Sequence, residues 1–434
     1  METITRTRTI LIAIVVAASY IDWGIIFSVQ PAFYPKEAEA KGATPSQYGF
    51  VFGIVHLAAF VSAPIFAKYG NRIGPKLLYN VGALVQGCQG IAFGFLTYVD
   101  NLGWFLGLSY FLRALDGLAD AAAWGAILSI LMKMWPNKVA SIMSWTELCF
   151  GLGYTVGPAI GSFLYSVGGF LLPFEITGGI GLLIAILIFF VIPNVDNIQV
   201  TESKEIIPEP VESKPSLTLT AVAKSPKLFM PYVDNVINFV GYGFVEAMIE
   251  PHLSEAGATQ IQVGYFFLIM GALYMVTTPV IGYTCDHIKS PILVSILGNL
   301  CMAVAFVFVG PLPWIPIEPS VNLLFGMAAW IGFSYTLCLV STFSRAHNEA
   351  MKRGYNDDLP TYLILSGLWS TSFYFGNFAG PTAGGFLVEY LDFRGSTIVF
   401  LALYVMMTIV DVAELVFDGV RPLKDVEIEE YEEI

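Results

Sequence analysis

Acidic residues inside apolar stretches are the side chains of this chain that could do chemistry, and Asp22 is the first of them. It stands near the centre of an otherwise apolar segment, with Tyr20, Trp23 and Phe27 close by in sequence. An ionised acid at the middle of a membrane costs about 2.5 to 3.5 kcal/mol on insertion scales, so it needs a partner, a watery cavity or a proton. Because an apolar site favours the neutral acid and a bound cation favours the carboxylate, proton and cation can compete there. The alternative is a neutral, hydrogen-bonded acid, or one close to the membrane surface.

A second set of polar side chains falls on one face of a later segment. Asn235, Asn238, Tyr242 and Glu246 recur at i, i+3, i+7 and i+11, which is a single helix face, and Glu250 follows one turn later, somewhat offset. A polar stripe on an apolar helix points inward rather than at lipid, so these residues are candidates for binding a substrate or a proton. Glu250 has an alternative interpretation, as a solvated acid at the mouth of the bundle where a proline ends the helix.

Arg113, Asp116 and Asp120 also share a helix face, because they stand at i, i+3 and i+7. Arg113 and Asp116 form either a static intrahelical pair, whose mutual neutralisation allows burial, or part of a proton relay. Glu147, in the next apolar segment, is a further candidate for a proton or substrate site.

Other polar and aromatic side chains have weaker claims. Asp411 and Glu414 stand near the end of the last apolar segment, where we expect them to face lipid headgroups. The five cysteines have no paired spacing, so we expect small buried hydrophobic residues rather than disulfides or a metal site. Five aromatic residues could line a cage for an amine through cation–π contacts, with core packing as the alternative for each. They are Tyr20, Trp23, Phe27, Tyr242 and Trp369.

Composition sets the elements that must position these side chains. The chain has 434 residues, of which 56% are hydrophobic and 13% charged, and this is too apolar for a soluble core. A helix needs about 20 mostly apolar residues to cross a membrane. We therefore predict an all-α membrane protein with twelve transmembrane helices. They lie near residues 10–31, 47–69, 77–97, 103–132, 139–165, 171–193, 228–252, 262–284, 291–312, 321–343, 360–388 and 394–417. The first is expected to be a retained span in a chain that begins at Met1, not a signal peptide.

Basic residues predict the orientation of these spans. If both termini are cytosolic, only Lys36, Lys41 and Arg394 of the 21 Lys and Arg residues fall on the other side, and Arg113 falls within a span. Cytoplasmic loops carry an excess of Lys and Arg, so this orientation is favoured. The net charge of −13 comes largely from an acidic linker and an acidic tail and says little about the substrate.

An internal repeat divides the chain into two similar halves. A Gly/Pro motif in the fifth span recurs in the eleventh, at an equivalent place, and we expect a substrate site between the halves. The predicted parts are 1–193 as the first six-helix half, 194–227 as a cytosolic linker, 228–417 as the second half and 418–434 as a cytosolic tail. The motif runs Gly153-x3-Gly157-Pro158 in the first copy and Gly376-x3-Gly380-Pro381 in the second.

With these residues in place, the chain resembles the major facilitator superfamily along nearly its whole length. The family's loop signature between helices two and three resembles Ala67-Lys68-Tyr69-Gly70-Asn71-Arg72-Ile73-Gly74-Pro75-Lys76, although Ala67 replaces the first glycine and Asn71 the acid. Its fourth-helix signature resembles Arg113-Ala114-Leu115-Asp116-Gly117, and the Gly/Pro element of the fifth span resembles the antiporter signature.

Within the superfamily, the chain resembles the vesicular amine transporters, particularly their polyamine-transporter-like branch. The likeness lies in residues 33–39, 135–140 and 380–387, in Asp22 nine residues before Pro31, and in a Glu-Pro element at Glu250. The long glycosylated loop of the monoamine members is missing, which favours the polyamine-like branch.

We therefore expect a proton-coupled antiporter of organic cations such as polyamines, working by alternating access in a vesicular or endolysosomal membrane, with the plasma membrane as an alternative. The other hypotheses are a uniporter or proton symporter of another small organic solute, and a transporter-like receptor or scaffold that moves nothing. No motif of an enzyme occurs, and no cofactor, metal or nucleic-acid partner is expected. The last four residues, Tyr431 to Ile434, fit a pattern bound by sorting adaptors.

Overall fold

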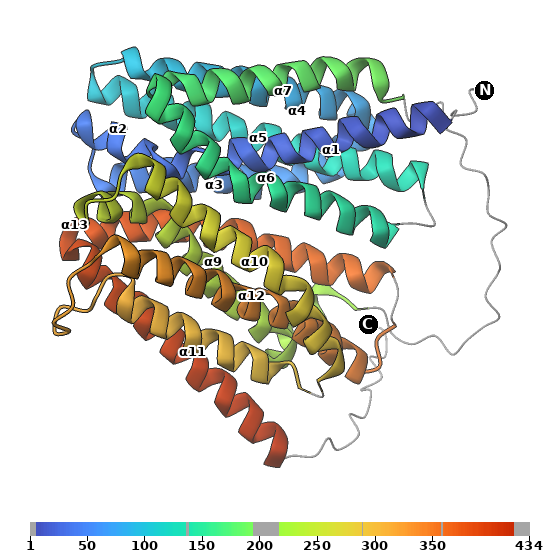
Figure 1. Ribbon diagram of the computed structural model, residues 1–434. Helices are drawn as coiled ribbons and strands as arrows, with labels where there is room; N and C mark the ends of the chain where they lie inside the picture. The colour runs from blue at the N-terminus through green and yellow to red at the C-terminus, as the bar shows by residue number, and fades with distance from the viewer. Residues whose placement is uncertain (1–5, 136–138, 194–216, 289, 357–358, 421–434) are drawn as a thin grey trace.

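In the residues that it describes, the computed structural model consists of helices joined by loops (Figure 1). It describes residues 6–135, 139–193, 217–288, 290–356 and 359–420. Most of the expected linker 194–227, most of the expected tail 418–434 and the whole Tyr431–Ile434 pattern lie outside these residues.

In the described residues, the first half of the chain contains six long helices and three short elements, two between α1 and α3 and one after α4. The long helices are α1 (Arg6–Ser28), α3 (Pro45–Ile73), α4 (Pro75–Gly94), α5 (Leu102–Met134), α6 (Val139–Gly168) and α7 (Leu171–Val191), and the short α2 (Tyr34–Ala40) precedes α3.

In the described residues, the second half contains five long helices, and the last of them consists of two helical segments joined at a kink. They are α9 (Pro226–Glu255), α10 (Gln260–His287), α11 (Ile292–Phe308), α12 (Val321–Lys352) and α13 (Leu359–Val420), after the short α8 (Leu219–Lys224). Helix α13 turns at Asp392, whose φ of 56° is non-helical, and the Asp392 side chain accepts a 2.8 Å hydrogen bond from the Gly395 N–H. This is an N-cap, so a twelfth helical segment begins there.

Nine segments of the described residues are long and apolar enough to cross a membrane, and one of them, Thr361–Phe417, spans both parts of α13. The shorter α11 is also apolar. Helix α9 is not among them, and it carries Asp234, Glu246 and Glu250. The protein is an all-α membrane protein of two six-helix halves, in agreement with the sequence-based prediction.

Equivalent helices in the two halves begin with the same cap. Thr44 before α3 and Thr259 before α10 each form a capping box, with Gln47 and Gln262 respectively as the third residue of the helix. In this arrangement the threonine and glutamine side chains satisfy N–H groups that the first helical turn leaves free. The shared cap is a further sign of the internal repeat, and it fixes where both helices start.

Glycines set the close approach of equivalent helix pairs. A Cβ added to Gly157 of α6 would overlap Ser28 of α1, and one added to Gly380 of α13 would overlap Val240 of α9. Small residues let helix backbones come together, and Pro158 and Pro381 stand next to these glycines inside their helices. A Cβ on Gly153 would likewise overlap the Ile21 carbonyl oxygen of α1. The repeated Gly/Pro motif therefore packs α6 on α1 and α13 on α9.

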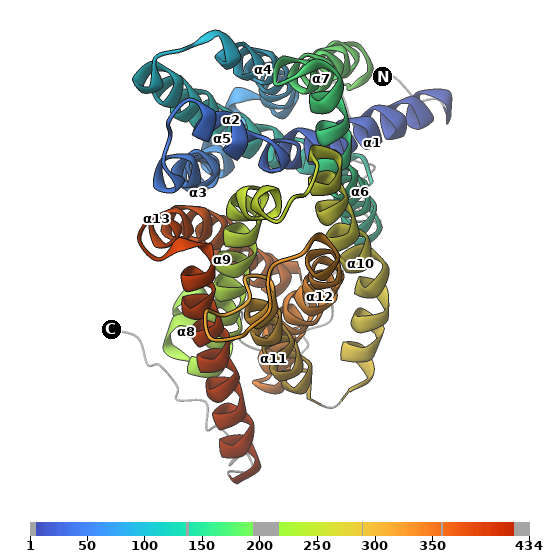
Figure 2. The same cartoon turned by 60° about the vertical axis from the view of Figure 1, so that its left-hand side comes forward.

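The two halves meet along α3 with α13 and along α6 with α10 (Figures 1 and 2). We call the end of the bundle that carries α2 and Asp392 the distal end, and the opposite end, where α1 begins and α13 finishes, the terminal end. The closest contacts between halves lie from the distal end to mid-helix: a Cβ on Gly385 would overlap Pro45, and the Ser46 N–H donates to Glu389 Oε2 at 3.4 Å.

Candidate functional site

A hydrogen-bonded chain joins the two halves at the middle of α6. The hydroxyl of Tyr154 donates a 2.6 Å bond to Glu246 Oε1 of α9, and the hydroxyl of Tyr242 donates a 2.9 Å bond to the Tyr154 oxygen. Glu246 is 8% exposed. Tyr242 and Glu246 both belong to the polar stripe that the sequence places on one helix face, and they do point inward, toward the other half.

An ion pair on α5 lies behind Glu246. Arg113 and Asp116 are both 2% exposed, and Arg113 Nη1 lies 2.8 Å from Asp116 Oδ2. Arg113 is also within electrostatic range of Glu246, while its Nε has no hydrogen-bond partner in the described chain. The guanidinium therefore faces two carboxylates, one from each half, and the pair is more than an isolated intrahelical contact.

Glu147 of α6 is an acid that is exposed although both halves surround it. Tyr20 of α1, Tyr274 of α10 and Tyr374 of α13 are all within electrostatic range of its carboxylate. Tyr20 and Glu147 belong to one half and the other two tyrosines to the other. Glu147 thus faces the space between the halves, two helical turns closer to the terminal end than Tyr154.

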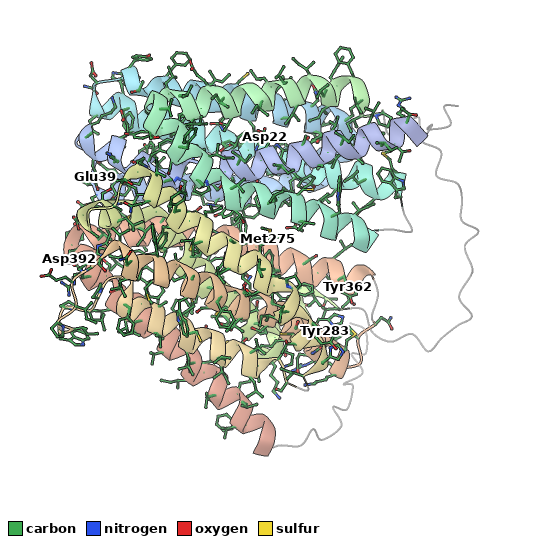
Figure 3. All side chains as sticks on the ribbon, viewed as in Figure 1. Asp22, Glu39, Met275, Tyr283, Tyr362 and Asp392 are labelled. Carbon is green, nitrogen blue, oxygen red and sulfur yellow. The ribbon has the colours of Figure 1, made fainter. Side chains whose placement is uncertain are left out.

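Asp22 does not lie with these residues. Asp22 lies on α1, within the first half (Figure 3). It is 5% exposed, and a Cβ on Gly181 of α7 would lie 3.0 Å from Asp22 Oδ2. The carboxylate therefore points at α7, inside the first half. No side chain in the described part of the chain donates a hydrogen bond to it or pairs with its charge. Asp22 is a buried acid without a partner, separated by α1 from the space between the halves.

Glu250 lies at the distal end, and it is buried there. It is 1% exposed, Ser254 donates a 2.9 Å bond to its Oε1, and its Oε2 has no partner in the described residues. A cavity of about 500 Å³ is lined by Glu250 together with Lys36 and Glu39 of α2. Glu250 is therefore near the mouth of the bundle, but Pro251 does not end the helix, because α9 continues to Glu255, and the carboxylate is not freely solvated.

The two asparagines of the polar stripe are buried away from Glu246. Both side-chain polar atoms of Asn238 lack a partner in the described chain. Asn235 Nδ2 donates to the Trp369 carbonyl oxygen at 3.5 Å, and Thr342 donates to Asn235 Oδ1 at the same distance. The stripe therefore divides into an outer part that reaches the other half and an inner part that packs within the second half.

The expected aromatic residues pack mainly on rings of their own half. Tyr20 and Trp23 of α1 pack on Trp124 of α5, with ring centroids 5.1 and 6.1 Å from it. Tyr242 stacks on Tyr335 of α12 at 4.7 Å. Sequence reasoning missed Trp124 and Tyr335, which have no charged residue next to them in sequence. The remaining expected rings also contact rings nearby: Phe27 packs on His56 and Tyr154, and Trp369 on Phe239.

The loop signature between α3 and α4 is a sharp turn. Gly74 has a φ of 104°, which favours glycine, and it ends α3 one residue before Pro75 begins α4. Arg72 is exposed. The side chains of Ala67 and Asn71, where the motif departs from the family pattern, lie outside those that the structure describes.

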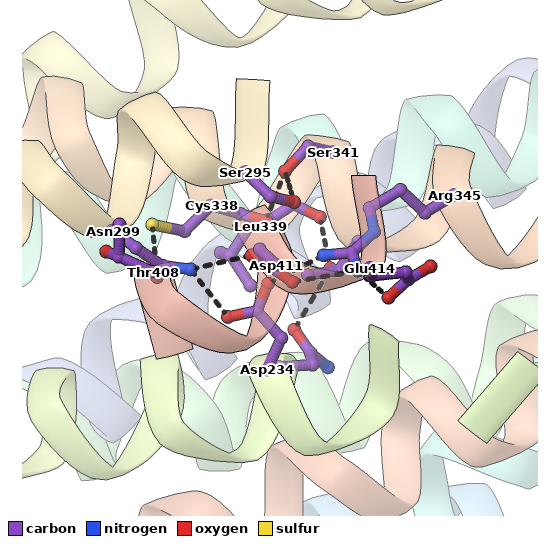
Figure 4. A network of polar contacts seen from close by, with 12 residues as sticks. Asp234, Ser295, Asn299, Cys338, Leu339, Ser341, Arg345, Thr408, Asp411 and Glu414 are labelled. Atoms are coloured by element: carbon purple, nitrogen blue, oxygen red, sulfur yellow. Dashed lines mark hydrogen bonds and ion pairs between the residues drawn. The ribbon is translucent and has the colours of Figure 1, made fainter. Parts of the chain in front are cut away.

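Two expectations are wrong, the exposure of Asp411 to lipid headgroups and the burial of Cys88. Asp411 is 0% exposed rather than at the lipid headgroups, and Arg345 of α12 binds both it and Glu414 (Figure 4). Asp411 points into the second half, where Arg345 and Asn299, which sequence reasoning did not select, are its partners. Among the cysteines, Cys88 is exposed while the other four are buried, and none of the five forms a disulfide within the described residues. No group of three or more His, Cys, Asp or Glu side chains in the described ranges is arranged to hold a metal.

Comparisons with known proteins agree with this architecture. The family model described as Major Facilitator Superfamily matches residues 12–355. The chain is 30% identical over 388 residues to the MFS-type transporter SLC18B1 of Homo sapiens, covering 88% of this chain and 81% of that protein. It is 29% identical over 400 residues to the protein of the same name from Mus musculus, covering 91% and 84%.

Solved structures share the fold. A bacterial homolog of the human lysosomal transporter Spinster, in an inward-facing and occupied conformation, superposes with a TM-score of 0.75 at 14% identity, covering 98% of this chain and 100% of that one. The nucleoside transporter NupG superposes with a TM-score of 0.68 at 12% identity, covering 94% and 99%. From the match of the family model and the SLC18B1 relatives, we conclude that this chain belongs to the major facilitator superfamily of membrane transporters.

Proposed function

We propose that the protein is a proton-coupled antiporter of organic cations, with polyamines and related amines as its substrates. The observation that carries the proposal is the bond between Tyr154 and Glu246, because it puts a buried carboxylate on the surface where the two halves meet. A cationic substrate between the halves would replace the tyrosine hydroxyl as the partner of that carboxylate. The likeness to the SLC18B1 proteins supports the same class of transporter.

Proton coupling follows from competition for one carboxylate. When no cation is bound, a proton neutralises Glu246 in its low-dielectric site, and when an ammonium group binds, the carboxylate is the favoured form. Arg113 holds a positive charge near Glu246, so it repels a cationic substrate while Glu246 is neutral. A pH difference of one unit supplies about 1.4 kcal/mol per proton, enough for about tenfold concentration of the exchanged solute.

A second acid suits a long substrate. Glu147 stands seven residues before Tyr154 on α6, a rise of about 10 Å along the helix. The carboxylates of Glu147 and Glu246 therefore lie at different depths in the bundle, and both face the other half. An elongated amine with a positive charge at each end fits this arrangement better than a compact monoamine, and the rings around Tyr20 and Trp124 offer cation–π contacts along the way.

Alternating access would open the distal end and close the terminal end. The contacts that must break are those between α3 and α13 and between α6 and α10, including the bond from Gln260 to the Ala32 carbonyl oxygen. Our proposal keeps the two halves at 1–193 and 228–417 as the moving bodies, with cytosolic termini and an acidic compartment at the distal end. A vesicular or endolysosomal membrane fits this orientation, and sorting adaptors could bind the tail.

Transport by reconstituted protein tests this function. Proteoliposomes with an acidic interior should accumulate labelled spermidine, an uncoupler should abolish the accumulation, and Glu246→Gln should lower it at least tenfold. The matched control is Glu318→Gln in the exposed loop before α12, which should transport like the wild type. Uptake that ignores the uncoupler would indicate a uniporter. No uptake of any amine by folded protein would favour another solute or a receptor role.

A further inference from the structure

Four side chains of the second half form a closed ring near the terminal end of α9 (Figure 4). Arg345 Nη1 donates to Asp234 Oδ2 at 3.1 Å, and its Nη2 lies 2.9 Å from Asp411 Oδ1. Asn299 Nδ2 closes the ring by donating to Asp234 Oδ1 and to Asp411 Oδ2, each at 3.1 Å. The ring joins α9, α11, α12 and the second part of α13.

The ring carries more negative than positive charge. Asp234, Asn299 and Asp411 are each 0% exposed and Arg345 is 6% exposed, so water does not compensate the two carboxylates. Besides Arg345, the groups that face the ring in the described chain are Cys338, Tyr404 and Glu414, and none of them is a cation. Two ionised aspartates with one guanidinium leave one uncompensated negative charge in a low-dielectric region, which is costly.

One oxygen of the ring is free to take a proton. Within the described chain, the contact of Asp411 Oδ1 is its 2.9 Å ion pair with Arg345 Nη2, whereas Asp411 Oδ2 and both oxygens of Asp234 accept well-aligned hydrogen bonds. A proton on Asp411 Oδ1 would break no existing hydrogen bond. It would remove the excess charge of the ring and weaken only the contact with Arg345 Nη2.

We propose that the ring of Asp234, Asn299, Arg345 and Asp411 is a proton-binding site, with Asp411 Oδ1 as the atom that receives the proton. It is separate from the central site, by which we mean Tyr154, Tyr242 and Glu246. Asp234 precedes Glu246 by twelve residues on α9, a rise of about 18 Å. A metal ion is not the ligand, because N–H donors already occupy three of the four carboxylate oxygens. The site belongs to the second half alone, so it needs no substrate between the halves.

Proton binding would change how four helices are held. With Asp411 ionised, Arg345 holds α13 through both Asp411 and Glu414, and with Asp411 neutral it holds α13 through Glu414 alone, while Asp234 still joins α12 to α9. Helix α12 also carries Tyr335, which stacks on Tyr242 beside Glu246. The proton on the ring therefore adjusts the packing of α12 and α9 behind the central site.

Infrared difference spectroscopy of the full-length protein in lipid nanodiscs tests the proposal without transport. Between alkaline and acidic pH, the wild type should gain an absorption of protonated aspartic acid, and labelling all aspartates with carbon-13 at the carboxyl group should shift it. Asp411→Asn should remove one such component, and Asp234→Asn should remove the same one, because the remaining aspartate then balances Arg345. Glu318→Gln is the control and should keep every component.

Two results would overturn the proposal. One is a wild-type spectrum in which no aspartic acid band responds to carbon-13 labelling, a measurement that needs no variant to fold. The other is a spectrum in which both single variants keep every component of the wild type. Neither result bears on amine transport, so failure of this site and failure of the proposed antiport are distinguishable.

Discussion

The hydroxyl of Tyr154 and the carboxylate of Glu246, on α6 and α9, are held 2.6 Å apart across the interface of the two halves. The bond joins the two halves, which would separate or rotate in the proposed transport cycle. Glu246 is thus both a candidate substrate ligand and part of the contact that holds the present conformation together.

Removing the Tyr154 hydroxyl should therefore loosen this conformation. Tyr154→Phe leaves Glu246 buried without its donor, at a cost of about 1 to 3 kcal/mol. Tyr242→Phe is the matched control, because it removes a hydroxyl from the same chain but leaves the bond to Glu246 in place. Thermal unfolding in detergent should show the larger loss for Tyr154→Phe. Equal losses for the two variants would contradict the importance of this bond.

The packing of α13 on α9 should depend on the absence of a side chain at Gly380. Gly380→Ala places a methyl group against the Val240 backbone, and overpacking of this kind costs about 1 to 3 kcal/mol. Gly367, on the same helix, has open space around it. Gly367→Ala should be neutral or stabilising, because alanine is the better helix former by up to about 1 kcal/mol. Thermal unfolding of the two variants would contradict this account if Gly380→Ala were the more stable.

The partnerless position of Asp22 predicts a split between affinity and coupling. Its carboxylate points at Gly181 inside the first half, where an ammonium group between the halves does not reach it. Asp22→Asn should leave the KM for spermidine within about twofold of the wild type, while uptake should lose the part of its dependence on the pH gradient that a proton on Asp22 adds to the one on Glu246. Initial rates at several gradients measure both quantities. A tenfold rise in KM with coupling intact would place Asp22 at the substrate instead.

Acidification should favour closure of the distal end. Partial burial raises the pKa of Glu39 above its usual value, and the Glu255 carboxylate adds to the effect while the Tyr48 hydroxyl opposes it. A raised pKa means that the closed form binds the proton more tightly than an open form does, so closure gains as pH falls from the raised pKa toward the ordinary glutamate value, and is lost as pH rises through the raised pKa. Below the ordinary value both forms are protonated and the effect levels off.

Distances between spin labels at Ala40 and Ala256 would measure this closure, with the exposed Cys88 replaced by serine. The short-distance population should rise on acidification in the wild type, and Glu39→Gln should flatten the pH dependence. Glu318→Gln should leave it unchanged. A pH response that survives in Glu39→Gln would show that another group senses the proton.

Much of the fold follows from the sequence, because apolar length and the Gly/Pro repeat depend on local composition. The helices of the described residues lie near the twelve predicted spans, although α9 is less apolar than the others, and Gly157 and Gly380 make equivalent contacts. The capping boxes at Thr44 and Thr259 were also readable as a repeat but were missed, because the residues that follow each box differ.

The site was only partly predictable. The helical spacing of Tyr242 and Glu246 indicates a shared face, and that face does point at the other half. The direction of Asp22 depends on which helices pack around α1, and no local pattern encodes this. Asp411 was misplaced for a similar reason: Arg345, its partner, lies on a different helix and far away in sequence.

Proton release on substrate binding tests the central claim most directly. Spermidine added to the purified protein in weakly buffered detergent solution should release protons, followed with a pH-sensitive dye, because the amine displaces the proton from Glu246. The account predicts a clear release by the wild type and by Glu318→Gln, and a much smaller one by Glu246→Gln. Two results would contradict the account: saturable spermidine binding with equal proton release by the wild type and Glu246→Gln, and saturable spermidine binding by the wild type with no proton release.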